Sequence, residues 1–140
     1  MTGVSDEQRL MRQWRELLAL HAHTFSSLDR ELQRFGLGAS DFEVLDVLTQ
    51  NDSGDDRGLY VHELAGLVHL SQSAVSRLVA RLARDGLITR KECSTDRRRV
   101  RVILTAVGRA RHREALPVQL TVLQQQLAVM PGESTPQADR

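Results

Sequence analysis

The chain of 140 residues is poor in cysteine, proline and aromatic residues: it has one cysteine, Cys93, three prolines and 4% aromatic residues. A single cysteine excludes an internal disulfide and is typical of a protein kept in a reducing compartment. The sequence shows neither a secretory signal near Met1 nor an apolar run long enough to span a membrane. We therefore expect a cytoplasmic protein that is long enough to bury a core of its own.

The sequence also lacks the usual marks of an enzyme. There is no glycine-rich phosphate loop, no nucleophile elbow and no carboxylate pair flanked by apolar residues. No histidine pair has the His-x-x-x-His spacing with a carboxylate partner that a strong metal motif requires; the histidines are His21, His23, His62, His69 and His112. We therefore expect no catalytic residue, no metal and no cofactor. We interpret Cys93 as an incidental thiol, because no second cysteine is present to pair with it.

The net charge of +1, taken alone, argues against a nucleic-acid partner. The distribution of the charges argues the other way. Residues 1–60 contain 11 acidic and 6 basic side chains, whereas residues 71–101 contain 9 basic and 3 acidic ones. An acidic front and a basic middle are typical of a protein that presents one oriented basic surface to a polyanion.

The chain begins with a long amphipathic helix, which we predict from about residue 5 to residue 34. The residues of its apolar stripe recur at steps of three and four, the spacing of one helix face; the stripe contains Leu10, Trp14, Leu17, Phe25, Leu28, Leu32 and Phe35, with His21 within it. This stripe is long enough to face more than the core of its own chain. We interpret His21 and Trp14 as core or interface residues first, and as the lining of a ligand cavity second. Gly36 and Gly38 are expected to end the helix.

Short elements follow. Ser40-Asp41-Phe42-Glu43 has the capping-box pattern and predicts a helix that begins at Ser40. Residues 51–58 read as a solvated acidic loop, 59–61 as one short strand and 62–68 as a short helix. After Thr105, which can cap a helix, the last long helix is expected to carry leucines on one face and to kink or break at Pro117. Residues 131–140 look like a disordered tail.

Residues 71–105 predict a helix with two different faces, followed by a basic hairpin. Ser71 is a good N-cap, and Val75, Leu78, Val79 and Leu82 form an apolar stripe. Small, polar and basic residues fall opposite it, namely Ser73, Ser76, Arg77, Ala80 and Arg84, with Arg81 at the flank. Gly86 fits a left-handed cap, and residues 87–92 and 100–104 read as strands around an arginine-rich tip. The predicted fold class is therefore mainly α with a small β-wing: a winged helix-turn-helix with long terminal helices.

Three motifs in the wing have a characteristic spacing: Gly86-Leu87-Ile88-x-Arg90, Asp96-x-Arg98, and Val102-x-Leu104-Thr105-x-x-Gly108. In this spacing the chain resembles the MarR family of bacterial transcriptional regulators, whose signature D-x-R-x-x-x-V-x-L-T it matches at every defined position. The resemblance implies a homodimer that regulates transcription as a repressor relieved by a small-molecule effector. It also implies that residues 71–85 enter the major groove of double-stranded DNA, while Arg98 reaches the minor groove with its guanidinium held by Asp96.

From the residues and this resemblance together, we expect a specific set of DNA contacts: Ser71, Gln72, Ser73, Ser76, Arg77, Arg81, Asp96, Arg97 and Arg98. A two-fold dimer predicts a near-palindromic operator with half-sites about one helical turn apart. The expected organisation is a dimerisation helix at 1–36, a DNA-binding lobe at 37–105, a second dimerisation helix at 106–130 and the tail at 131–140. No motif identifies residues that would bind the effector.

The sequence departs from the family pattern at its C-terminal end. Family members usually add another helix after the long one, whereas here Pro131-Gly132 follows a few residues after the last leucine. A dimer would have to use the first and last long helices; the expected interface is Leu10, Trp14, Leu17, Leu116, Leu120, Leu123 and Leu127. One alternative stays open, a winged-helix module that binds an acidic protein rather than DNA.

Overall fold

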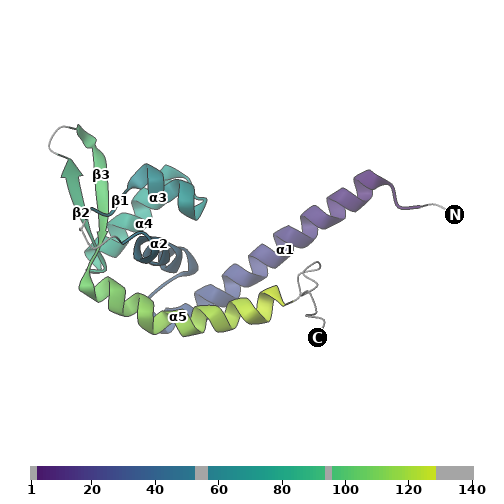
Figure 1. Ribbon diagram of the computed structural model, residues 1–140. Coiled ribbons are helices and arrows are strands. Elements are labelled where there is room, and N and C mark those ends of the chain that lie inside the picture. Colours follow the sequence, from purple (N-terminus) through teal and green to yellow (C-terminus); the bar gives the residue numbers. More distant parts are fainter. Residues whose placement is uncertain (1–2, 53–56, 94–95, 129–140) are drawn as a thin grey trace, which may run out of the picture.

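The structure, a computed structural model, describes residues 3–52, 57–93 and 96–128, with the backbone alone at 93 and 96–98. In chain order the elements are α1 (Asp6–Leu32), the 3-10 turn η1 (Gln33–Phe35), α2 (Ala39–Gln50), β1 (Leu59–Tyr60), α3 (Val61–Val68), α4 (Gln72–Arg84), β2 (Ile88–Cys93), β3 (Asp96–Leu104) and α5 (Ala106–Leu127). Helices α2–α4 and the strands form one lobe (Figure 1). Helix α5 runs beside the second half of α1, while the first half of α1 extends away from the rest (Figure 1). The predicted winged helix-turn-helix is confirmed.

Helix α1 begins and ends as its sequence predicts. The Ser5 hydroxyl accepts from the Gln8 N–H at 3.2 Å, and the Gln8 side chain accepts from the Ser5 N–H at 3.2 Å, which satisfies two backbone donors at once. At the other end the last turn tightens into η1, and Gly36 takes the left-handed conformation with φ 69°. A residue without Cβ adopts that conformation at little cost, so the chain can turn there towards α2.

The expected start of α2 is wrong by two residues. The N-cap is Gly38 rather than Ser40, and Asp41, the third residue of the helix, reaches back so that its Oδ2 accepts from the Gly38 N–H at 2.7 Å. The cause is tertiary, because Leu37 and Ala39 are buried in the core and draw the start of the helix inwards. The Asp41 carboxylate therefore caps the N-terminus of α2, the role that the sequence pattern assigned to Ser40 and Glu43.

The three-stranded antiparallel sheet has the order β1-β3-β2. Val102 and Leu104 face the core from β3, and Ile88, which pairs with Leu104, faces it from β2. The apolar stripe of α4 packs into the same core: Val75, Val79 and Leu82 are buried and Leu78 is partly buried. Burial of these apolar side chains fixes how α4 and the wing lie on the rest of the lobe.

Helix α5 is held to α2 by a buried histidine. His112 is 6% exposed, stacks on the Phe42 ring at 5.1 Å between centroids, and has its Nε2 2.8 Å from Oδ1 of Asp46. The expected kink or break at Pro117 takes a mild form: the helix continues to Leu127 and changes direction between its two halves (Figure 1). Proline removes one hydrogen bond from the helix but leaves the rest of the turns intact.

A small junction joins α4, the wing and α5. The Thr105 hydroxyl accepts from the Gly108 N–H at 3.0 Å and donates to the Gly86 carbonyl at 2.7 Å, while the Thr105 N–H donates to the Leu87 carbonyl at 3.1 Å. The first turn of α5 lies so close to Leu87 that a Cβ on Gly108 would overlap the Leu87 carbonyl oxygen. The glycine of the wing motif is therefore required by packing.

Replacing Gly108 with alanine should destabilise the protein although alanine is the better helix former. We expect the overlap with the Leu87 carbonyl to lower the free energy of unfolding by roughly 1–3 kcal/mol, as overpacking usually does. Gly66→Ala is the matched control, since Gly66 also lies inside a helix but has open space around its Cβ position. That variant should be stabilised by up to about 1 kcal/mol. Urea unfolding of both variants measures the difference; equal effects would contradict the packing argument.

Candidate nucleic-acid interface

Helix α4 presents a face to solvent that is polar or basic except for Ala80. Its exposed residues are Gln72, Ser73, Ser76, Arg77, Ala80, Arg81 and Arg84. The two faces expected from the helical wheel are thus confirmed, since the apolar residues lie in the core. A helix whose apolar side is fully used for packing can present its whole polar side to a partner.

The N-terminal turn of α4 combines hydroxyl groups with a nearby arginine. The Ser71 hydroxyl accepts from the Ala74 N–H at 3.2 Å and lies 3.2 Å from the Ser73 hydroxyl. Arg77 follows one turn later and donates from Nε to the Ser73 carbonyl at 3.4 Å. The first turn carries no acidic residue. A helix N-terminus with these groups favours a phosphate, because its dipole and its donors both attract negative charge.

A tight turn places α3 against α4. His69 ends α3 in the left-handed conformation with φ 58°, and its N–H donates to the Ala65 carbonyl. Leu64 and Ala65 on α3 are buried in the core that also receives α4. The pair α3–α4 therefore has the helix-turn-helix arrangement expected from its sequence.

The wing carries a basic cluster that was not expected from the sequence. Tyr60 on β1 pairs in register with Arg101 on β3, and its hydroxyl accepts from Arg101 Nη2 at 3.0 Å. The guanidinium carbons of Arg101 and Arg99 lie 5.1 Å and 5.6 Å from the centre of the Tyr60 ring, and His62 stacks on its ring at 5.7 Å. The alternation along β3 placed both arginines on one face, but only the pairing of β1 with β3 brings the tyrosine to them.

The arginine-rich tip is described only in part. Asp96, Arg97 and Arg98 belong to β3 by their backbone, and their side chains lie outside what the structure describes, as do residues 94–95 of the tip. The expected contact between Asp96 and Arg98 stays a prediction. The expected tail at 131–140 lies outside the described residues as well.

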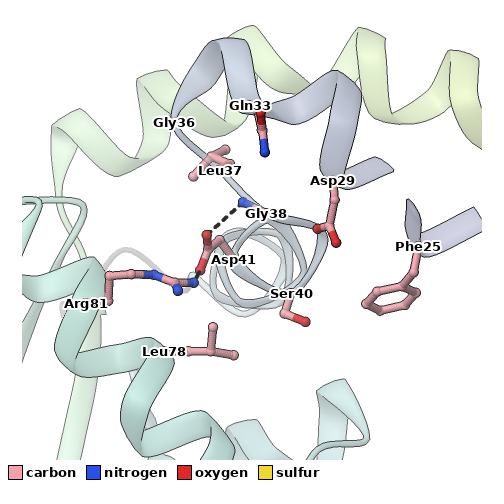
Figure 2. Close-up of a pocket in the computed structure, with 10 residues that line it drawn as sticks. All are labelled: Phe25, Asp29, Gln33, Gly36, Leu37, Gly38, Ser40, Asp41, Leu78 and Arg81. Carbon is pink, nitrogen blue, oxygen red and sulfur yellow. Dashed lines mark hydrogen bonds and ion pairs between the residues drawn. The ribbon is translucent and has the colours of Figure 1, made fainter. Parts of the chain in front are cut away.

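Arg81 differs from the other arginines of α4 because it is paired. Its Nη2 donates to Oδ1 of Asp41, a carboxylate whose side chain is 6% exposed (Figure 2). The pair lies at the edge of a cavity of about 700 Å³ between α1, α2 and α4 (Figure 2). The cavity is lined by Phe25, Asp29, Gln33, Gly36, Leu37, Gly38, Ser40, Asp41, Leu78 and Arg81.

The predicted dimer residues fall into two groups. Leu10, Trp14 and Leu17 on the projecting half of α1 are 64%, 55% and 53% exposed. Leu120 and Leu127 on α5 are exposed too, whereas Leu116 and Leu123 pack against the chain's own core. Further exposed apolar residues at this end of the molecule were not expected from the sequence, namely Val4 just before α1 and Met11 and Leu18 within it. The exposed group remains available for a partner.

The described part of the chain contains neither a membrane-spanning helix nor a metal-binding group of side chains. None of its helices has the length and apolar character to cross a membrane. Nor do its histidine, cysteine and acidic side chains gather in a group of three or more that could hold a metal ion.

Comparisons with known proteins agree with this geometry. Residues 35–99 match the model of the MarR family. An 82-residue stretch is 34% identical to the HTH-type transcriptional repressor YetL of Bacillus subtilis (strain 168), and it covers 59% of this chain and 47% of that protein. The chain thus spans about half the length of that relative.

Solved structures extend the similarity to almost the whole chain. Sco3205 of Streptomyces coelicolor, a MarR-family regulator solved in complex with DNA, is 28% identical with a TM-score of 0.75, covering 94% of this chain and 81% of that one. AbsC, a MarR-family regulator of the same organism, shares the fold at 24% identity with a TM-score of 0.74, covering 94% and 86%. In its helix pair, its wing motif and these matches, the chain is similar to the MarR family, whose model covers residues 35–99.

Proposed function

We propose that this protein is a transcriptional regulator that binds double-stranded DNA sequence-specifically, with α4 in the major groove and the wing in the adjacent minor groove. The observation that carries the proposal is the exposed polar face of α4, which starts at a helix N-terminus free of acidic residues. The proposed contacts on α4 are Ser71, Gln72, Ser73, Ser76 and Arg77, with Asp96, Arg97 and Arg98 on the wing. The DNA complex of Sco3205 supports the proposal by similarity.

The proposed active form is a homodimer. Leu10, Trp14 and Leu17 leave an apolar stripe in solvent on a helix half that extends away from its own lobe (Figure 1). Large exposed apolar surfaces of this kind mark interaction sites. A two-fold axis through this region would present two copies of α4 to a near-palindromic operator with half-sites about one turn of DNA apart.

The proposed regulation is a repressor relieved by a small molecule. The cavity of about 700 Å³ supports it, because its walls come from α1, α2 and α4 and its volume is that of a small-molecule site. A ligand there would shift the DNA-binding lobe relative to the dimerisation helices, so that both half-sites could no longer be bound together.

Selection of bound sequences from random duplex DNA tests the function. We expect an enriched motif with two-fold symmetry, and an affinity that falls linearly with salt on logarithmic axes because phosphate binding releases counterions. If no duplex is bound even at low salt, the protein-interaction module becomes the better interpretation.

Replacing Arg98 with alanine should weaken operator binding. An arginine in a narrow minor groove responds to its negative potential, so the loss should be roughly 1–3 kcal/mol per subunit, as for a good base contact, and greatest for operators with A·T-rich flanks. Fluorescence anisotropy with labelled operator measures the change. Arg113→Ala is the control, since it removes the same charge from an exposed position on α5. Equal affinity of the Arg98 variant and wild type would reject the wing contact.

Replacing Leu17 with glutamate should turn the dimer into a monomer at micromolar concentration, because the charge would be buried unpaired in the interface. Leu67→Glu on α3 is the control, since Leu67 is 49% exposed and Leu17 is 53% exposed. Size-exclusion chromatography with light scattering gives the mass of each. A monomeric wild type would contradict the proposed dimer, and a dimeric Leu17 variant would move the interface elsewhere.

A further inference from the structure

We infer that Arg81 is a positioning residue rather than a phosphate ligand: it ends a chain of hydrogen bonds that ties α1, through the first turn of α2, to α4. The inference rests on the proposed DNA binding for its effect on affinity. It changes the role expected for Arg81, which its place on the flank of α4 made a DNA contact.

The first link of the chain is the buried carboxylate of Asp41. Its two oxygens have separate partners, the Gly38 N–H at 2.7 Å for Oδ2 and the Arg81 guanidinium for Oδ1 (Figure 2). A buried charge is strongly destabilising when its partner leaves. Arg81 is therefore held towards α2, and moving it to a phosphate would leave Asp41 unpaired in the protein.

The second link comes from α1. Oδ1 of Asp29 accepts from the Ala39 N–H at 2.7 Å. Asp29 and Asp41 thus satisfy two successive N–H groups that the start of α2 cannot satisfy within the helix. The first turn of α2 is fixed to α1 by one acid and to α4 by the other.

Arg77 shows what an available arginine on the same helix looks like. It lies one turn before Arg81, and the contact described for its guanidinium is with the Ser73 carbonyl of its own helix at 3.4 Å. Arg77 can turn to a phosphate without leaving a buried acid behind, whereas Arg81 cannot. Two arginines four residues apart on one helix are therefore assigned different roles by their partners.

The two possible roles of Arg81 predict opposite changes in DNA affinity for one substitution, Asp41→Asn. If Arg81 bound phosphate, the substitution would free its guanidinium and remove a negative charge, so affinity for DNA would rise. If Arg81 positions α4, the substitution loosens α4 and affinity falls. The number of neutralised phosphates would not change in that case, so the salt dependence would keep its slope.

The experiment measures operator affinity of the full-length protein at several salt concentrations for Asp41→Asn, Arg81→Gln, the double variant and Arg77→Gln. We expect each single change at Asp41 or Arg81 to weaken binding about tenfold at an unchanged slope, and the double variant to bind no more weakly than either, because one interaction is lost in all three. Arg77→Gln should instead lower the slope by about 0.9 for each phosphate released. Arg81→Lys, which can still donate to Asp41, should recover most of the affinity.

Hydrogen exchange on the free protein tests the same coupling without DNA. Asp41→Asn should speed amide exchange in the last turns of α4, and Arg81→Gln should speed it in the first turn of α2. Unchanged exchange in both segments, or an Asp41 variant that binds DNA as tightly as wild type or more tightly, would overturn the inference. Failure of the wild type to bind any duplex would reject the proposed function instead, while the exchange result would still decide the coupling.

Discussion

The close contact between the first turn of α5 and the backbone at Gly86 and Leu87 is the constraint on which the rest of the structure depends. The Leu87 carbonyl accepts from the Thr105 N–H, and Gly108 leaves room for the approach. At this point α4 ends, β2 begins, β3 ends and α5 begins. The room left by Gly108 therefore sets how α4 and the wing lie on α5.

Once this junction fixes α4 on the core, its polar side has to face solvent. Val75, Val79 and Leu82 have to lie in the core, so the serines and arginines opposite them have to lie in solvent. The acids of the chain do not neutralise this face evenly. Asp41 is buried beside Arg81 and forms an ion pair with it. Arg77, one turn away, contacts only the Ser73 carbonyl among the contacts described for its guanidinium, so its charge can interact with a phosphate. Neighbouring arginines on a basic helix can thus serve orientation and binding separately.

Much of the fold was predictable because it depends on local chemistry. The helix periodicity, the caps at Ser71 and Thr105, the left-handed Gly86 and the alternation along β3 all act within a few residues, and all are confirmed. The start of α2 was not predictable in this way. The pattern at Ser40 and Glu43 is a valid cap in isolation, but burial of Leu37 and Ala39 moves the helix start to where Asp41 can reach Gly38.

The candidate site likewise has features that the sequence predicts and features that only packing decides. Sequence by itself determined the family signature, the segregation of basic residues into 71–101 and the two faces of α4, because these depend on residue type and spacing. Tertiary structure decided which charges have partners: Arg81 with Asp41, His112 with Asp46, and Arg101 with Tyr60, pairs separated by about forty residues or more. Such pairs form only when packing brings distant segments together, and the spacing of residues along the chain does not predict which segments will meet.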